Sequence, residues 1–284
     1  MQQTWTWSIT GYSFSGLPHE EIHRICKLAG AAGIEGAPGM FGNNAKPELE
    51  HIAEAYRAEG LAISSFHLPF AADDDIASFY ETTRRRAAEN AVRWMEIAAA
   101  LGASVGIQHP TTNKLNVDVE GADPYVRQIG RSLETMLPAA ESLGVTVALE
   151  NMLPAEGGRF MSRPEHIERI IREFGHPKLG FCLDTGHALV AGGPDRAGEI
   201  LDAMAPALAA FHLADNAGYT DSHLAPGRGL VDWTAVFRRA AELRYAGPMC
   251  IETRPFAHGP RFSDESWKQL VAETEALSQK ALSD

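Results

Sequence analysis

Residues 145-VTVALENMLPAEGGRFMSRPEHIERIIREFGHPKLGFCLD-184 contain two short apolar runs separated by a helix-like segment. The runs 145–150 and 179–184 have the length and composition of buried strands, and each ends in an acidic residue. The segment 164–174 is typical of a helix that begins at proline. This order of strand, helix and strand predicts two parallel strands joined by a crossover helix.

The same alternation extends in both directions from this stretch. We expect strands at about 4–9, 33–37, 61–67, 103–108, 145–150, 179–184, 208–213 and 249–252. We expect helices at about 18–32, 47–59, 76–101, 164–174, 195–204, 232–243 and 263–282, and one that ends at Gly144. Eight alternating units predict the α/β class and a (β/α)₈ TIM barrel, with residues 1–284 as a single domain. An open doubly wound sheet is less favoured because no GxGxxG follows the first strand.

The composition excludes several classes of protein. The 284 residues include 25 Lys and Arg against 37 Asp and Glu, so the formal charge is −12. This acidic balance disfavours a nucleic-acid partner. The chain shows neither a membrane-spanning apolar run nor the basic start and apolar core of a signal peptide. Cys26, Cys182 and Cys250 form no CxxC pair, so we expect a cytoplasmic protein with reduced thiols, whose oligomeric state, including a homo-oligomer, stays open.

Residues that can bind metal fall at the ends of six consecutive expected strands. They are His67, His109, Glu150, Asp184, His212 and Glu252. One such residue alone would more often be a hydrogen-bonded core side chain. Since all carboxyl ends of the strands in a (β/α)₈ barrel open on one face, these six are expected to converge there. The pattern predicts a metal or catalytic cluster.

The ligand types indicate which ion would bind. Glu150, Asp184, His212 and Glu252 supply three carboxylates and one imidazole. This oxygen-rich set suits Mn²⁺, Mg²⁺ or Co²⁺, with Zn²⁺ as an alternative. It differs from the cysteine-rich set of a structural zinc site.

Several motifs in the second half of the chain carry a family resemblance. They are 148-ALEN-151, 182-CLDTGH-187, 211-FHLAD-215, 221-DSHLAPGRGLVDW-233 and 250-CIE-252. In their order and placement they resemble the xylose-isomerase-like TIM barrel superfamily, which includes sugar isomerases, epimerases and the endonuclease IV group. The resemblance implies that Glu150, Asp184, His212 and Glu252 hold one divalent ion. It also implies that Glu150 and Glu252 move protons.

The ketose 3-epimerase branch of that superfamily suggests further roles. By resemblance, His187 and Glu156 match substrate-binding residues. An arginine that the branch uses six residues after its metal histidine is replaced here by Gly218, so the same ketose substrate is not implied. We expect His67 and His109 to hydrogen-bond substrate hydroxyls.

The endonuclease IV group offers a rival reading. Those enzymes hold three zinc ions, and their remaining ligands are matched by His67, His109, His187, Asp221 and His223. The Asp221-x-His223 motif before a Pro-Gly-x-Gly turn is also common among sugar-enzyme relatives, so it does not decide between the two. Asp221 and His223 are therefore candidates for additional metal ligands.

The expected function is a divalent-metal-dependent sugar isomerase or epimerase acting on a ketose or polyol derivative by proton transfer through an enediolate. One alternative is a lyase or dehydratase acting on a related keto-sugar or keto-inositol. Another is an endonuclease IV-like trinuclear-zinc phosphodiesterase. Trp5, Trp7, Tyr12 and Phe14 are expected near the end of the first strand, where an aromatic wall could stack on a sugar, although core packing is favoured for at least one tryptophan. Arg228 is expected to be an exposed turn residue.

Overall fold

The computed structural model describes residues 4–14, 16–42, 44–155, 158–253 and 262–283. Its strands form one closed parallel barrel in sequence order, with the first and last strands paired. The strands are β1 (Trp7–Thr10), β2 (Gly33–Gly36), β3 (Ala62–His67), β4 (Val105–Gln108), β5 (Thr146–Glu150), β6 (Leu179–Asp184), β7 (Leu208–Leu213) and β8 (Met249–Ile251). The expected (β/α)₈ barrel is confirmed.

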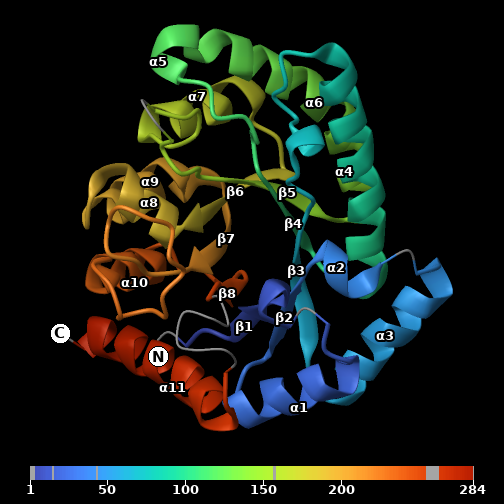
Figure 1. Cartoon of the computed structure of the whole chain (residues 1–284), viewed down its shortest axis with the longest axis vertical. Helices are drawn as coiled ribbons and strands as arrows, with labels where there is room; N and C mark the ends of the chain where they lie inside the picture. Colours follow the sequence, from blue (N-terminus) through green and yellow to red (C-terminus); the bar gives the residue numbers. More distant parts are fainter. Residues whose placement is uncertain (1–3, 15, 43, 156–157, 254–261, 284) are drawn as a thin grey trace.

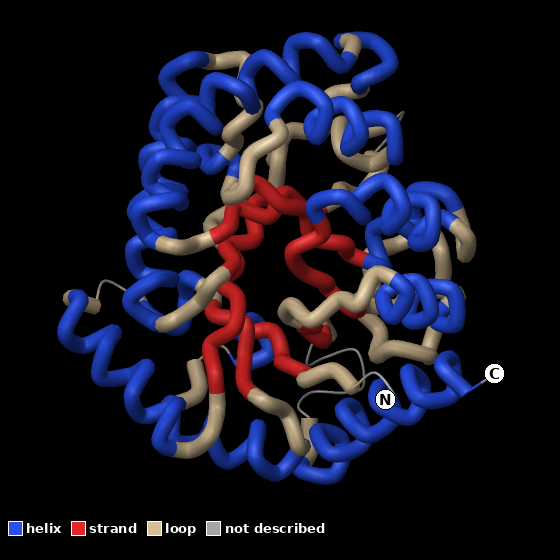
Figure 2. Tube along the Cα trace, turned by 180° about the vertical axis from the view of Figure 1, so that it is seen from behind, coloured by secondary structure: helices blue, strands red, loops and turns tan. Residues whose placement is uncertain are grey.

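Helices surround the barrel on all sides (Figures 1 and 2). They are α1 (His19–Ala29), α2 (Pro38–Phe41), α3 (Lys46–Ala58), α4 (Glu81–Leu101), α5 (Val117–Glu120), α6 (Ala122–Leu143), α7 (Pro164–Phe174), α8 (Thr185–Gly192), α9 (Arg196–Met204), α10 (Trp233–Glu242) and α11 (Asp264–Ser283). Gly144 ends α6 with a φ of 73°, a left-handed conformation that glycine adopts without steric cost. The short helix α8, which directly follows β6, was not expected from the sequence.

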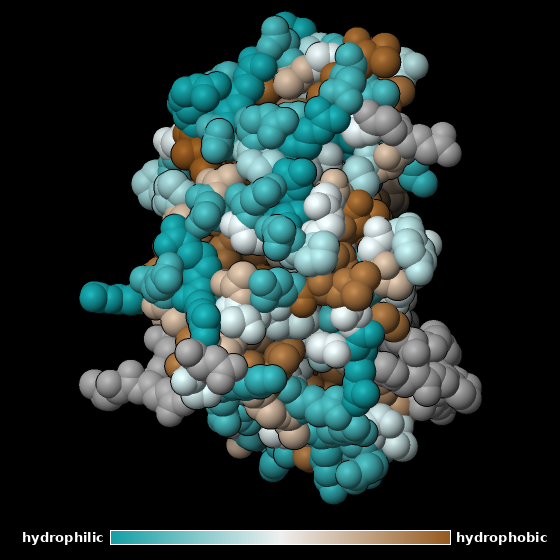
Figure 3. Space-filling view, turned by 90° about the vertical axis from the view of Figure 1, so that its left-hand side faces the viewer, coloured by the Kyte–Doolittle hydropathy of each residue, from teal (hydrophilic) through white to brown (hydrophobic). Residues whose placement is uncertain are grey.

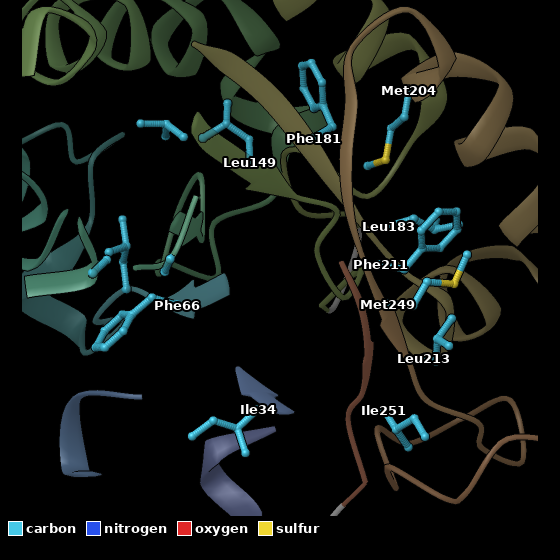
Figure 4. Packing of buried hydrophobic residues seen from close by; sticks show 14 of the residues in the cluster. Ile34, Phe66, Leu149, Phe181, Leu183, Met204, Phe211, Leu213, Met249 and Ile251 are labelled. Carbon is cyan, nitrogen blue, oxygen red and sulfur yellow. The ribbon is translucent and has the colours of Figure 1, made fainter. Parts of the chain in front are cut away.

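Neighbouring side chains along each strand point to opposite faces of the sheet and so contribute to two separate apolar clusters. Leu149, Phe181 and Leu183 belong to the large core between the sheet and the helices, where Figure 4 shows them. Ala148 and Cys182 belong to a second, small cluster, which also contains Val105, Ile107 and Ala210. Because neighbouring residues of a strand point to opposite faces, this second cluster fills the barrel interior. Glu150 and Asp184 lie two residues beyond Ala148 and Cys182, so they share the inward direction.

Several strand boundaries differ from the expectation, and two of the differences bear on the expected site. The first strand begins at Trp7, and Trp5 and Trp7 pack against Phe237, with ring centroids 5.6 and 6.1 Å from it. Both tryptophans are therefore core residues at the opposite end of β1 from Tyr12, and the expected aromatic wall is wrong for them. The last strand ends at Ile251, so Glu252 follows the strand instead of closing it.

Polar side chains dominate the outer face shown in Figure 3, where apolar ones are interspersed among them. This is the ordinary surface of amphipathic helices whose apolar stripes face a sheet. None of the helices in the described ranges has the length and apolar character needed to cross a membrane.

Candidate active site

Four ligand-type side chains meet at the carboxyl end of the barrel. Glu150 and Asp184 are the last residues of β5 and β6, His212 is the penultimate residue of β7, and Glu252 follows β8. One ligand atom from each lies within 4.8 Å of the others. Two ligands bound to one ion at about 2.2 Å each can lie at most ~4.4 Å apart, so small adjustments bring all four to coordinating distance. We call Glu150, Asp184, His212 and Glu252 the quartet.

The quartet contains unsatisfied negative charge. Glu150 Oε2, Asp184 Oδ2 and Glu252 Oε2 are buried without a hydrogen-bond partner among the described residues. His109 Nε2 makes an ion-pair contact of 3.0 Å with the first of these oxygens. Burying carboxylate oxygens that accept no hydrogen bond is costly, and a bound cation lowers that cost. The donor set, with three such oxygens among the described residues, therefore fits a divalent ion.

Burial and neighbouring charges shift the pKa values of two carboxyl groups of the quartet. Burial raises the pKa of Glu252 well above its usual range, and the carboxylates of Asp184 and Glu150 raise it further. Burial also opposes ionisation of Glu150, but His212 and His109 outweigh it and hold that pKa well below the usual range. The pKa values of the two glutamates are thus shifted in opposite directions.

His212 is oriented by a carboxylate that the sequence reasoning missed. Its Nδ1 faces the quartet, 3.0 Å from Glu150 Oε1 and 3.3 Å from Glu252 Oε2. Its Nε2 lies 3.1 Å from both carboxylate oxygens of Glu35, a fully buried residue of β2. The hydroxyl of Ser65 donates to Glu35 at 2.7 Å. The sequence does show this glutamate inside the expected strand 33–37. It was missed because the candidate site residues were sought at the ends of strands.

Hydrogen bonds hold both the side chain and the main chain of Asp184. Its Oδ1 accepts a hydrogen bond from the backbone N–H of His187 at 2.6 Å, so Asp184 is the N-cap of α8. The side chain of Asn151 brackets its main chain, accepting from Asp184 N at 2.8 Å and donating to Asp184 O at 2.9 Å. The imidazole of His187 is in turn 2.9 Å from the carbonyl oxygen of Asn151 through Nδ1. These bonds hold the backbone and Oδ1 of Asp184 in place at the strand-to-helix turn.

A second group of ligand-type residues lies beside the quartet. One atom each of His187, Asp221 and His223 lies within 4.8 Å of the others. His223 Nε2 is 2.8 Å from Asp221 Oδ2, and its Nδ1 is 3.0 Å from the carbonyl oxygen of Glu252. Burial lowers the pKa of His223, but the hydrogen bond and charge of Asp221 outweigh it and raise the pKa above the usual value. The structure thus brings together the three residues that the sequence analysis could not assign between substrate and metal.

The loop that carries Asp221 and His223 is held by the buried carboxylate of Asp215. Its Oδ1 accepts from the N–H groups of residues 216 and 231, and its Oδ2 accepts from Gly227 N and Trp233 Nε1. Four donors satisfy this carboxylate completely, in contrast with the quartet. Asp215 is therefore a structural residue of the site.

His67 and His109 stand on the other side of Glu150. His67 Nε2 is 3.7 Å and His109 Nε2 is 3.0 Å from Glu150 Oε2. Burial and the neighbouring His109 lower the pKa of His67 to about 4, so that imidazole is neutral near pH 7. Phe70 stacks on His109 with ring centroids 4.6 Å apart. Both histidines were expected at the site, and both line its cavity.

The cavity above the quartet has a volume of about 500 Å³. Glu150 and Glu252 line it, whereas Asp184 and His212 lie beneath its wall and are 0% exposed. The cavity is also lined by Tyr12 and by the apolar side chains of Phe70, Met152 and Leu153. Arg159, which the sequence analysis did not identify, lines it as well. Glu156, an expected substrate-binding residue, lies outside the described residues. Another cavity, of about 660 Å³, lies by α3 and α4 and contains none of the expected site residues.

Comparisons with known proteins agree with this architecture. An uncharacterized protein from Methanocaldococcus jannaschii is 31% identical over 224 residues, which cover 78% of this chain and 72% of the relative. The crystal structure of a D-tagatose 3-epimerase-like protein aligns with a TM-score of 0.79 at 21% identity, covering 98% of this chain and 97% of that one. A 3-keto-D-glucoside 4-epimerase from E. coli aligns with a TM-score of 0.77 at 18% identity, covering 96% and 100%.

At these identities the structural likeness establishes the fold alone. The family model described as xylose isomerase-like TIM barrel matches residues 24–275, most of the chain. This match confirms the resemblance drawn from the strand-end motifs. The chain belongs to the xylose isomerase-like TIM barrel family.

Proposed function

We propose that this protein is a divalent-metal-dependent isomerase or epimerase of a ketose-type sugar or polyol derivative. The observation that carries the proposal is the quartet, in which three carboxylate oxygens without a hydrogen bond among the described residues lie together beneath a cavity at the strand ends. The solved structures of similar fold include proteins described as sugar epimerases. Their descriptions agree with a small carbohydrate as the substrate.

The quartet would hold the ion, which is Mn²⁺, Mg²⁺ or Co²⁺ by ligand type, with Zn²⁺ as the alternative. When bound, such an ion polarises a substrate carbonyl and stabilises the negative charge that develops as a neighbouring C–H proton leaves. Asp184 and His212 do not line the cavity, so their contribution is confined to binding the ion.

Glu150 and Glu252 are suited to move the proton. Both line the cavity, and they come from β5 and the end of β8, with two strands of the barrel between them. A substrate held over the quartet would meet one carboxylate from each side. One can remove the proton on the carbon next to the carbonyl while the other returns a proton to the opposite face. His187, His67 and His109 line the same cavity and would hydrogen-bond the hydroxyls that fix the sugar.

Deuterium incorporation from D₂O tests this function. Metal-loaded protein is incubated with a panel of ketoses and keto-polyols, and exchange at the carbon next to the carbonyl is followed by NMR. Glu150→Gln and Glu252→Gln retain the side-chain shape but lose the base, so each is expected to slow exchange ~10²- to 10⁴-fold. Glu54→Gln, an exposed site on α3, is the matched control. Metal content is measured on the same samples, and undiminished exchange in both metal-loaded variants contradicts the assignment.

Product analysis in the same assay separates an isomerase from a lyase. Proton removal is common to both, but a lyase or dehydratase expels a β-substituent afterwards, so water or another leaving group is lost from the product. A product with the mass of the substrate plus the incorporated deuterium supports the isomerase or epimerase. A dehydrated product supports the lyase.

A trinuclear phosphodiesterase is the second candidate, because His187, Asp221 and His223 form their own ligand group beside the quartet. The formal charge of −12 weighs against a DNA substrate. We expect no incision of a duplex containing an abasic site. Incision that is lost in His109→Ala or His223→Ala would instead favour this second function.

A further inference from the structure

Arg159 is the one lysine or arginine among the described residues that line the site cavity. It lies in the segment between β5 and α7 and is only 8% exposed. The cavity otherwise contains the carboxylates of Glu150, Asp221 and Glu252. Arginine is seldom buried without partners, so the hydrogen bonds of this guanidinium matter.

The guanidinium of Arg159 is only partly satisfied by the protein. Its Nη2 donates to the carbonyl oxygen of Thr111 at 2.6 Å. Its Nε is buried and has no hydrogen-bond partner, and no described carboxylate forms an ion pair with it. Asp75 lies close enough to act on it through space, but the Asp75 oxygens accept from Ala77 N and Asn113 Nδ2. Arginine remains charged in proteins, so this cation is buried without a bonded anion among the residues that the structure describes.

We propose that Arg159 binds an anionic group of the substrate, a carboxylate or a phosphate. This inference rests on the proposed function and narrows its substrate class from ketoses in general to keto-sugar acids or ketose phosphates. Planar guanidinium groups match both anions through paired N–H donors. A bound anion would also offset the cost of burying the cation.

Two other positions where an arginine could bind an anion do not supply a free cation. Arg228, in the Pro-Gly-Arg-Gly turn, is exposed and bonds both carboxylate oxygens of Glu273, at 2.7 and 2.6 Å. Gly218 stands where the resemblance to ketose 3-epimerases would place an arginine. The positive charge that lines this cavity therefore comes from a different segment, the one that follows β5.

Binding of matched ligands tests the inference. Isothermal titration of metal-loaded wild-type protein compares D-fructose, which is neutral, with D-fructose 6-phosphate and 5-keto-D-gluconate. The phosphate and carboxylate compounds distinguish the two anions. At least one of them is expected to bind ~10- to 100-fold more tightly than D-fructose, the range for a charge-assisted hydrogen bond. Equal or weaker binding of both anions overturns the proposal.

Variants show whether Arg159 causes the preference, since an ion at the quartet also attracts anions. Arg159→Gln is expected to remove the ~10- to 100-fold preference, and Arg159→Lys to keep part of it, while metal content stays unchanged. Arg163→Gln is the control, because Arg163 pairs with Asp118 and does not line the cavity. A preference that survives in folded Arg159→Gln overturns the assignment. If Arg159→Gln does not fold, a reduced preference in Arg159→Lys supports the assignment and a fully retained preference overturns it.

The proposed function and this inference can fail separately. Deuterium exchange that is equally fast with neutral and anionic ketoses, without a binding preference, would retain the function and refute the anion site. An Arg159-dependent preference without exchange in any compound would retain the anion site and refute the isomerase.

Discussion

Glu35→Gln should weaken metal binding although Glu35 does not belong to the quartet. Glu35 is fully buried, and its two oxygens lie 3.1 Å from His212 Nε2. Because Nδ1 of His212 faces the quartet, Nε2–H is left to donate to Glu35. Burial raises the pKa of Glu35, but His212 more than offsets it and lowers the pKa, so the partner is a carboxylate. This carboxylate fixes the ring orientation and, on the proposed function, would strengthen Nδ1 as a metal ligand.

The glutamine keeps the size of Glu35 but removes the charge and can present an N–H₂ group to Nε2. Loss of such an outer partner typically costs ~10- to 100-fold in metal affinity, or ~1.4–2.7 kcal/mol. Competition with a chelator for Mn²⁺ measures this loss without any assay of activity. Glu54→Gln, the same change at an exposed site, is the control. A Glu35→Gln protein that folds and retains the wild-type Kd would refute the reasoning.

Two further predictions concern the metal and acid stability. Asp184→Ala should abolish tight divalent-ion binding in elemental analysis while the barrel stays folded, and an unchanged metal-to-chain ratio would exclude Asp184 as a ligand. Burial lowers the pKa of His166 from 6.5 to about 4. Above pH 6.5 it has no effect, but between pH 6.5 and 4 the unfolded state binds the proton first, so stability falls by up to ~1.4 kcal/mol per pH unit. In urea titrations at pH 7, 6 and 5, His166→Gln should lose stability less steeply, and parallel profiles would contradict this.

The sequence predicts most of the fold because its signals are local. The strands 179–184 and 208–213 and the helix 164–174 have the expected bounds, since apolar runs flanked by polar segments mark them clearly. Helix α8 is missed because the strand β6 leads into it without a loop, and its cap is Asp184, already assigned as a ligand. The start of β1 is placed too early because Trp5 belongs to a residue type that favours strands, but here it precedes the strand and packs against Phe237.

The site is predicted where an acidic residue closes an apolar run, as Glu150 and Asp184 do. Such a residue is conspicuous, because a carboxylate next to a buried strand needs a partner. Glu35 is not conspicuous, since its strand is only four residues long and has glycine at both ends. Arg159 lies in an irregular segment, where spacing carries no information about direction. Only the structure shows that Glu35 contacts the His212 ring and that Arg159 lines the cavity.

The two unsatisfied charges of the site have opposite signs and are both kept buried by the fold. Within the described ranges, the quartet has carboxylate oxygens that accept no hydrogen bond, and Arg159 has a guanidinium N–H that donates none. The same protein satisfies Asp215 with four donors, so the lack of partners at the other positions is not a general feature of its polar interior. Buried groups that lack partners reduce stability and are retained where a ligand supplies the missing interaction. On the proposals made above, a cation at the quartet and an anionic substrate group at Arg159 supply both, and a substrate that reaches from one to the other would be held at two points with its carbonyl between Glu150 and Glu252.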